Sequence, residues 1–425
     1  MRDNARLRAI GATSAVALFA LLAGCGGSGG SGEPSARDGS PTSSSTPVTP
    51  TVTSQESEAA PLTAYDPPTR FEEHGSIRAP ELRNVALDGQ KAYYLAAGEL
   101  VAQDLAGNED IGAVKAGTSS SDDLPYAPGL GTAEGRRYAV AAFPFRTKGE
   151  GSAGDTVGVE VVAMDAESGQ EAWRTKWDLP KSYDTHLVTY VAGVTGRTAV
   201  VVSHGENRYP VTYGIDLVTH KVTWSETDFK AQLVQGTRVL GQRRGAEGAL
   251  TLAAVDGGRG RDLWTGMEVG EDWTVRTFAP DSAWVGDPEG RAVIDSATGK
   301  DRRYEAFGER LHTIQDCVYD QLKSTICFSS TVEGGEISAY DRTGKRLWRV
   351  GGPSDSSDRK EMRLGSAFHG AVYAYLSDGP YVPIVLDGAT GADKVTDPGV
   401  APQLTNAYVG LVAAGGEIKV YRATG

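Results

Sequence analysis

A short phrase that recurs along the chain constrains the fold more than any other feature of the sequence. Its clearest copy, from Ala339 to Trp348, reads A-Y-D-R-T-G-K-R-L-W. A strand-forming run ends at an Asp, a turn carries a Gly, and a second run leads to an aromatic residue. The Asp recurs at intervals of 39 to 61 residues, as Asp104, Asp165, Asp216, Asp256, Asp295, Asp341 and Asp387. Repetition at this period predicts one supersecondary unit copied along the chain.

The local chemistry of the phrase predicts a strand, a tight turn and a second strand. The run before each Asp is small or β-branched and alternates, as a half-buried strand does. An Asp side chain accepts hydrogen bonds from amides two or three residues further on, which fixes a turn. The Gly adopts a positive φ at little cost, and His220, which replaces it in one copy, tolerates the same region. We therefore expect the seven Asp residues to be structural turn residues and not catalytic carboxylates.

An aromatic residue follows most of the turns. We expect these side chains to pack between neighbouring sheets, and not to form a stacking platform for nucleic-acid bases. The predicted set is Phe71, Trp173, Trp224, Trp264, Tyr304 and Trp348. Four strands per unit at a period of 40–50 residues are typical of a β-propeller.

The two ends of the repeat region bear on the number of blades. The last residues, G-E-I-K-V-Y-R-A-T-G, match G-E-I-S-A-Y-D-R-T-G of the clear copy, with Arg422 at the Asp position. They stop before an aromatic strand, whereas Phe71 lies on a strand with no Asp before it. We therefore predict an all-β, eight-bladed propeller of four-stranded antiparallel blades, closed by the N- and C-terminal strands. Seven blades are the alternative.

The phrase resembles the PQQ-like propeller repeat, whose signature is close to A-x-D-x-x-T-G-x-x-x-W. Two copies fit it best, through Ala163, Asp165, Ser168, Gly169 and Trp173, and through Ala339, Asp341, Thr343, Gly344 and Trp348. The resemblance covers roughly residues 69–425. It implies a propeller shared by quinoprotein enzymes and by non-enzymatic, lipid-anchored scaffolds of the BamB type.

The quinoprotein enzymes bind PQQ and Ca²⁺ in the central funnel, and many carry adjacent Cys residues that form a vicinal disulfide. That motif is absent here, and the six His residues show no metal-ligand spacing. We therefore expect no catalytic residues, no cofactor-binding residues, no metal site and no cofactor.

The N-terminus has the pattern of an export signal. Arg2, Arg6 and Arg8 precede an uncharged run over residues 9–23, which is too short to span a bilayer. The run ends in L-A-G-C, which resembles the lipobox of bacterial lipoproteins and implies cleavage before Cys25 and lipid attachment to it. Residues 1–24 are thus predicted to be a lipoprotein signal peptide. A plain secretory signal is the alternative.

Residues 25–68 are rich in Gly, Ser, Thr and Pro and show no apolar periodicity. Such a segment cannot offset the entropy of ordering it, so we predict a disordered tether with a reach of roughly 35–40 Å. The composition also suits an O-glycosylated stalk. Residues 69–425 are then the propeller domain.

Cys317 and Cys327 lie ten residues apart on two strand-like runs joined by a short turn. In an exported protein this arrangement predicts a disulfide, with two buried free thiols as the alternative.

The net charge and the predicted cellular location limit the kinds of partner that the protein can bind. There are 42 basic and 55 acidic residues, a net charge of −13, which argues against binding nucleic acid or an anionic bilayer surface. We predict a monomeric propeller on the extracytoplasmic side of the cell membrane. Its predicted role is non-catalytic, as a binding or scaffold lipoprotein for a protein or cell-envelope partner. The alternatives are a PQQ-dependent quinoprotein oxidoreductase and an extracellular small-ligand sensor.

Overall fold

The computed structural model describes residues 60–117, 126–149, 155–180, 187–205, 210–286, 291–302, 314–331, 334–352, 359, 361–376 and 381–425. These residues all belong to one compact unit, Ser57–Gly425. They are almost entirely β-strand. A single 3₁₀ helix, η1 (Leu82–Asn84), is the only helix among them, and no described helix has the length and apolarity needed to cross a membrane.

Eight antiparallel sheets follow one another along the chain, and we number them as blades. Blade 1 contains β2 (Val85–Asp88), β3 (Lys91–Ala96), β4 (Glu99–Asp104) and β5 (Glu109–Lys115). Blade 2 contains β6 (Gly129–Ala133), β7 (Arg136–Thr147), β8 (Thr156–Asp165) and β9 (Glu171–Asp178). Blade 3 contains β10 (Leu187–Thr195), β11 (Thr198–Gly205), β12 (Val211–Asp216) and β13 (Val222–Thr227). Blade 4 contains β14 (Phe229–Gln235), β15 (Arg238–Arg244), β16 (Leu250–Asp256) and β17 (Asp262–Glu268).

The second half of the chain repeats this order. Blade 5 has three described strands, β18 (Thr274–Ala279), β19 (Ser282–Gly286) and β20 (Arg291–Asp295). Blade 6 contains β21 (Ile314–Tyr319), β22 (Ser324–Thr331), β23 (Gly334–Asp341) and β24 (Arg346–Gly351). Blade 7 contains β25 (Met362–Phe368), β26 (Ala371–Leu376), β27 (Val382–Asp387) and β28 (Asp393–Val395). Blade 8 contains β29 (Leu404–Thr405), β30 (Val409–Ala414), β31 (Glu417–Ala423) and β1 (Phe71–Ile77).

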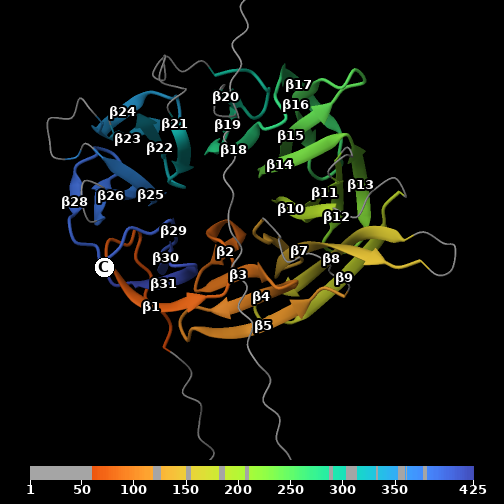
Figure 1. Ribbon diagram of the computed structural model, residues 1–425, viewed down its shortest axis with the longest axis horizontal. Coiled ribbons are helices and arrows are strands. Elements are labelled where there is room, and N and C mark those ends of the chain that lie inside the picture. Colours follow the sequence, from red (N-terminus) through yellow and green to blue (C-terminus); the bar gives the residue numbers. More distant parts are fainter. Residues whose placement is uncertain are drawn as a thin grey trace, which may run out of the picture. The chain divides into compact units, whose positions relative to one another are not determined.

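The blades stand around a common centre, with the first strand of each blade nearest that centre (Figure 1). Blade 8 combines the two ends of the propeller: β1 is its outer strand and pairs with β31, from Phe71 opposite Ala423 to Ile77 opposite Ile418. The predicted all-β, eight-bladed ring closed by its terminal strands is therefore confirmed, and the seven-bladed alternative is excluded.

Consecutive antiparallel strands give the ring two different faces. One face carries the turns between the first and second strands and between the third and fourth strands of each blade; we call it the turn face. The other carries the connections between second and third strands and those between blades; we call it the loop face. Every recurring Asp ends a third strand, so all seven lie on the turn face.

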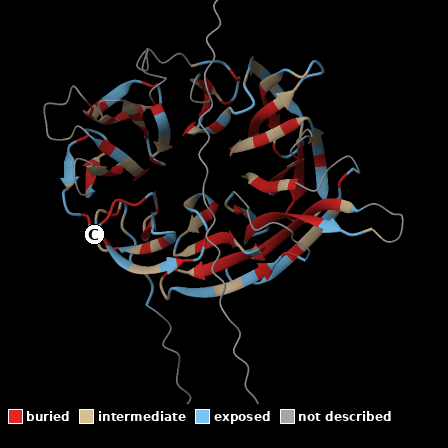
Figure 2. Ribbon diagram, in the orientation of Figure 1, coloured by how far each residue is buried: buried red, intermediate tan, exposed pale blue. Residues whose placement is uncertain are grey.

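The core lies between neighbouring blades, and the buried residues follow the inner strands of each sheet (Figure 2). One cluster, for example, joins Val140 and Val161 of blade 2 to Val201 and Ile215 of blade 3. The side chains are mostly small or β-branched, which allows flat sheets to approach closely and exclude water. The hydrophobic effect thus holds each blade to the next.

Candidate functional site

The seven recurring Asp residues all bond to the main chain of their own turns. Asp165 accepts from the amides of Glu167 at 3.1 Å and Ser168 at 2.9 Å, and the hydrogen bond from the Ser168 amide lowers the pKa of Asp165. The other six accept turn amides in the same way. A carboxylate used in this way has a structural role in the turn.

A Trp from one blade packs on the turn of the next blade. Trp348 of blade 6 donates from Nε1 to the carbonyl oxygen of Gly388 at 2.9 Å, and its ring covers Gly391 of blade 7. A Cβ at Gly391 would lie 2.8 Å from that ring. The same joint forms between Trp224 and Gly260, and between Trp264 and Gly299. We call this arrangement the Trp joint.

The joint between blades 2 and 3 has a different form. His220 stands where the other turns have Gly, with a φ of 60°, and its ring stacks on Trp173 with centroids 4.9 Å apart. The buried Nε1 of Trp173 has no hydrogen-bond partner among the described residues. The larger turn residue therefore replaces the indole hydrogen bond with ring stacking.

Phe71 does not occupy the Trp position that its sequence context predicts. The residue of β1 that lies at this position is Gly75, which pairs with Val420 and would place a Cβ 2.4 Å from Asn108 of blade 1. Phe71 is buried instead against Tyr373 of blade 7, with ring centroids 5.6 Å apart. Phe71 thus packs between neighbouring sheets, as predicted, but its assignment to the Trp position was wrong, because no Asp turn precedes β1 and the sequence offered no fixed point from which to count.

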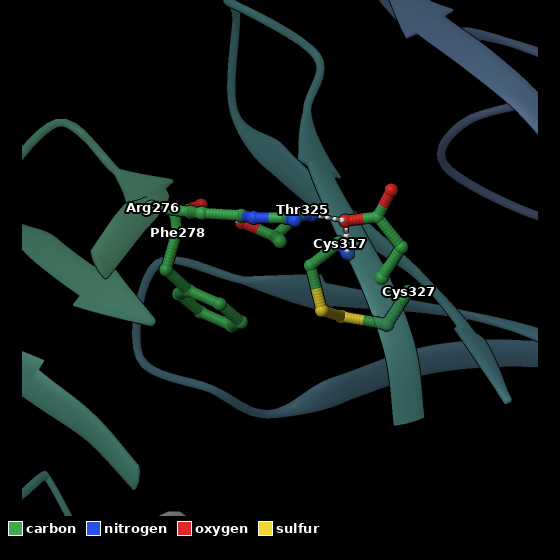
Figure 3. Close-up of a disulfide and its surroundings, with 6 residues drawn as sticks. Arg276, Phe278, Cys317, Thr325 and Cys327 are labelled. Atoms are coloured by element: carbon green, nitrogen blue, oxygen red, sulfur yellow. Dashed lines mark hydrogen bonds and ion pairs between the residues drawn. A yellow bond between two sulfur atoms is a disulfide. The ribbon is translucent and has the colours of Figure 1, made fainter. Parts of the chain in front are cut away.

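A disulfide joins Cys317 and Cys327 on facing positions of β21 and β22 (Figure 3). Beside it, Asp316 accepts a hydrogen bond from Arg276 of blade 5 at 2.9 Å. Thr325 donates to the carbonyl oxygen of Phe278, also in blade 5. The disulfide therefore braces the strand pair that bonds to the preceding blade. Cys25 and Tyr304 lie outside the described residues.

Residues 60–70 lie across the turn face and form a strap. Leu62 donates its amide to Gln90 Oε1 of blade 1 at 2.6 Å, and Tyr65 donates to Ala407 O of blade 8 at 2.8 Å. Asp66 pairs with His369 of blade 7, and Pro68 O accepts from the Tyr373 hydroxyl at 2.7 Å. Residues 60–68, which composition assigned to the tether, are thus bonded to three blades. A segment with few apolar residues can be ordered in this way because the folded propeller already provides the surface to which it bonds.

On the loop face, a cavity of about 190 Å³ opens between blades 3 and 4. Strand ends on both sides supply its polar side chains. They are His204 from β11, Asp228 and Lys230 at the start of β14, Gln242 and Arg244 from the end of β15, and Glu271 from the connection between β17 and β18. We call this cavity the loop-face pocket.

Hydrogen bonds between the two blades fix the walls of the pocket. The Thr212 hydroxyl donates to Phe229 O at 2.6 Å and lies 3.2 Å from the amide of Ala231, so it holds the residues on both sides of Lys230. The buried Tyr190 hydroxyl also donates to Ala231 O, at 2.8 Å. The main chain that carries Lys230 is therefore held by blade 3 as well as by its own sheet.

Two ionisable groups in the pocket have lowered pKa values. Burial lowers the pKa of the Lys230 ammonium group. Burial, followed by the positive charge of Lys230, lowers the pKa of His204 to about 4. His204 is therefore a neutral imidazole at pH 7, able to donate one hydrogen bond and accept another.

Sequence reasoning did not identify this pocket. His204 and Lys230 belong to different repeats and lie 26 positions apart with no motif between them. The usable signal was departure from the repeat, because the segment S-H-G-E-N-R-Y-P, which begins with the last three residues of β11, is longer than its counterparts. No cluster of three His, Cys, Asp or Glu side chains suited to a metal occurs in the described part of the chain.

The His204 environment predicts a pH-dependent stability. Its pKa falls from about 6.5 in the unfolded chain to about 4 in the folded one, so the unfolded chain takes up a proton first on acidification. The stability that the fold has while this imidazole is neutral is therefore fully present above pH 6.5. It is lost as the pH falls toward 4. We expect the free energy of unfolding to drop by about 1–2 kcal/mol more in the wild type than in His204→Gln between pH 7 and pH 4.5. Urea titrations of both proteins at the two pH values measure this difference, and equal drops would contradict it.

The closed ring, the Asp turns and the Trp joints define an eight-bladed β-propeller with PQQ-like repeats. A family model described as outer membrane protein assembly factor BamB matches residues 158–317. A search of curated proteins for sequence relatives found no match.

Several solved structures were matched by comparison with this chain. BamB from Moraxella catarrhalis is 15% identical, with 83% of this chain and 99% of that chain covered and a TM-score of 0.42. A europium-containing methanol dehydrogenase is 12% identical, with 76% and 80% covered and a TM-score of 0.44. The quinohemoprotein alcohol dehydrogenase ADHIIG from Pseudomonas putida HK5 is 11% identical, with 85% and 76% covered and a TM-score of 0.44. Likeness at this level carries no argument about the fold or the activity of this protein.

The disulfide differs from the vicinal disulfide that the resemblance associates with quinoprotein enzymes. The disulfide links facing positions on two strands, ten residues apart, and not two adjacent Cys residues.

Proposed function

We propose that this protein is a lipid-anchored, extracytoplasmic binding protein that presents its loop face to a protein or cell-envelope partner without catalysing a reaction. The strap is the main observation that supports this proposal. It bonds the N-terminal end of the propeller to the turn face, so a chain anchored at Cys25 reaches the propeller on that side. The loop face and its pocket then remain clear of the anchor.

The architecture suits a scaffold. A buried cluster joins each blade to the next, Trp joints reinforce three of these contacts, and the terminal strands close the ring. A rigid surface loses little conformational entropy when a partner binds, which favours affinity for a given contact area. The family whose model matches residues 158–317 is described as an assembly factor, which supports a protein partner over a small substrate.

Site-specific photo-crosslinking tests the proposal on intact cells. Glu247 and Arg259 are both exposed and lie at opposite ends of β16, at the loop face and the turn face respectively. A photoreactive residue at position 247 should capture a discrete envelope component, whereas the same residue at 259 should not. Capture only from position 259 would reverse the assignment of the faces.

The non-catalytic part has its own test. Purified protein incubated with PQQ and Ca²⁺ should neither change the cofactor's absorbance nor reduce an electron-accepting dye in the presence of alcohols. Dye reduction that depends on PQQ would overturn this part and favour a quinoprotein oxidoreductase.

A further inference from the structure

The loop-face pocket holds one positive charge that forms no ion pair with the described residues. Lys230 is partly buried, and no carboxylate of the described residues forms an ion pair with its ammonium group. Asp272 acts on Lys230 through its electrostatic field, without an ion pair. Burying an ammonium group without a counter-ion is costly, so the site favours a ligand that supplies one.

Three of the other polar side chains of the pocket, Arg244, Glu271 and Gln242, are already engaged with one another or with the main chain. Arg244 pairs with Glu271, whose carboxylate lies at the exposed rim, 3.3 Å from the guanidinium group. Gln242 donates to the carbonyl oxygens of Gly270 and Trp273, both at 2.9 Å, and so holds the connection that carries Glu271. Asp228 also lines the pocket. The uncompensated charge is therefore that of Lys230, within a rim that is acidic.

His204 lines the same pocket as Lys230 and provides a second polar group there. Its ring packs edge-on against Tyr190, with centroids 6.4 Å apart, and the Lys230 charge acts on it directly. A neutral imidazole next to an ammonium group offers a second hydrogen-bond donor to the same anion. Thr212 and Tyr190 fix the main chain around Lys230, so the strand that carries its side chain is in place before any ligand arrives.

We propose that the loop-face pocket binds a single carboxylate group, held by the Lys230 ammonium and the His204 imidazole. One unpaired cation matches one negative charge, whereas phosphate sites use several cations or bidentate Arg groups. The acidic rim of Asp228 and Glu271 disfavours ligands with two or more negative charges and suits a carboxylate attached to a neutral or cationic body. This inference deepens the proposed function and rests on it only for the source of the carboxylate, which is a free small acid or an acidic group of the partner.

Titration with small acids tests the chemistry without a partner. N-acetylglycine carries one carboxylate, N-acetylglycinamide is its neutral counterpart, and inorganic phosphate is the multiply charged comparison. We expect N-acetylglycine alone to bind by NMR or calorimetry at pH 7. Lys230→Met should weaken it about 10- to 100-fold, as loss of one hydrogen bond to a charged group does. Lys230→Arg should retain most of the affinity, and Lys300→Met, an exposed lysine near the turn face, should retain all of it.

The outcomes separate the inference from the proposed function. Equal binding of the acid and the amide, tighter binding of phosphate, or unchanged affinity in a folded Lys230→Met protein would each overturn the carboxylate site. Loss of both acid binding and crosslinking from position 247 in Lys230→Met would identify an acidic group of the partner as the natural ligand. Loss of acid binding with crosslinking unchanged would support a free small acid. Acid binding without any partner captured would leave the carboxylate site standing and would refute the scaffold.

Discussion

Replacing Trp348 by alanine is expected to lower the free energy of unfolding by about 3–5 kcal/mol. The Trp348 side chain is 9% exposed and lies in the cluster that joins blades 6 and 7. The substitution removes its ring from the face of Gly391 and leaves the carbonyl oxygen of Gly388 without its indole donor. A cavity and an unsatisfied buried acceptor both destabilise the fold. Chemical denaturation followed by Trp fluorescence and circular dichroism measures the effect.

Two variants of the same strand separate these causes. Leu347→Ala is the matched control, because Leu347 is 42% exposed and lies next to Trp348 on β24; we expect a change within about 0.5 kcal/mol. Trp348→Phe keeps an aromatic ring but cannot donate to Gly388, so its effect should be intermediate. If Trp348→Ala were no more destabilising than Leu347→Ala, the Trp joint would not contribute to holding the blades together.

Replacing Cys25 by serine is expected to abolish membrane retention. A thioether-linked diacylglycerol on Cys25 would place two acyl chains in the bilayer, which suffices for stable anchoring where one chain is marginal. A serine hydroxyl cannot take part in that linkage. The protein should therefore pass from the membrane fraction to the soluble fraction, or remain as an unprocessed precursor of higher mass. Fractionation with immunoblotting and intact-mass measurement follow both outcomes.

A control substitution tests whether the cysteine itself matters. Ser28→Ala lies three positions further on in the same Gly/Ser-rich segment and should leave membrane retention unchanged. A Cys25→Ser protein that stays in the membrane at its mature mass would refute lipidation at this position. It would also remove the reason to regard the turn face as the side of the anchor.

The strap links the proposed anchor at Cys25 to one face of the propeller. A segment of 35 residues, 25–59, precedes the first described residue. Bonding of residues 62–68 to blades 1, 8 and 7 places the end of that segment on the turn face. The loop face is then the surface with freest access to a partner, which is why both proposals concern that face.

Much of the fold could be predicted because its signals are local and repeated. Asp341 and its turn are specified within five residues, through hydrogen bonds from Thr343 and Lys345 at 2.8 and 3.0 Å. Seven such turns and the truncated copy around Arg422 were enough to count eight blades and to pair the two terminal strands. The disulfide was predictable for the same reason, since Cys317 and Cys327 face each other across one short hairpin.

The failures occurred where the local signal was missing. Phe71 was assigned to the Trp position by its aromatic character alone, and the register of β1 against β31 places Gly75 there instead. The strap was assigned to the tether because Gly, Ser, Thr and Pro dominate the preceding segment. Its contacts are made with residues some 300 positions away, such as Asp66 with His369, and composition contains no information about them.

The sequence by itself determined the propeller, the number of its blades, the closure by its ends and the disulfide, because a repeated local pattern specifies each of these through short-range hydrogen bonding and strand alternation. Only the tertiary structure decided which face carries the strap and that His204 and Lys230 share one pocket. Those two residues belong to different blades, and the ring brings them together through the bonds of Thr212 and Tyr190. A pocket of this kind has no signature along the chain, because its charge balance depends on which side chains the packing of two blades leaves without a partner.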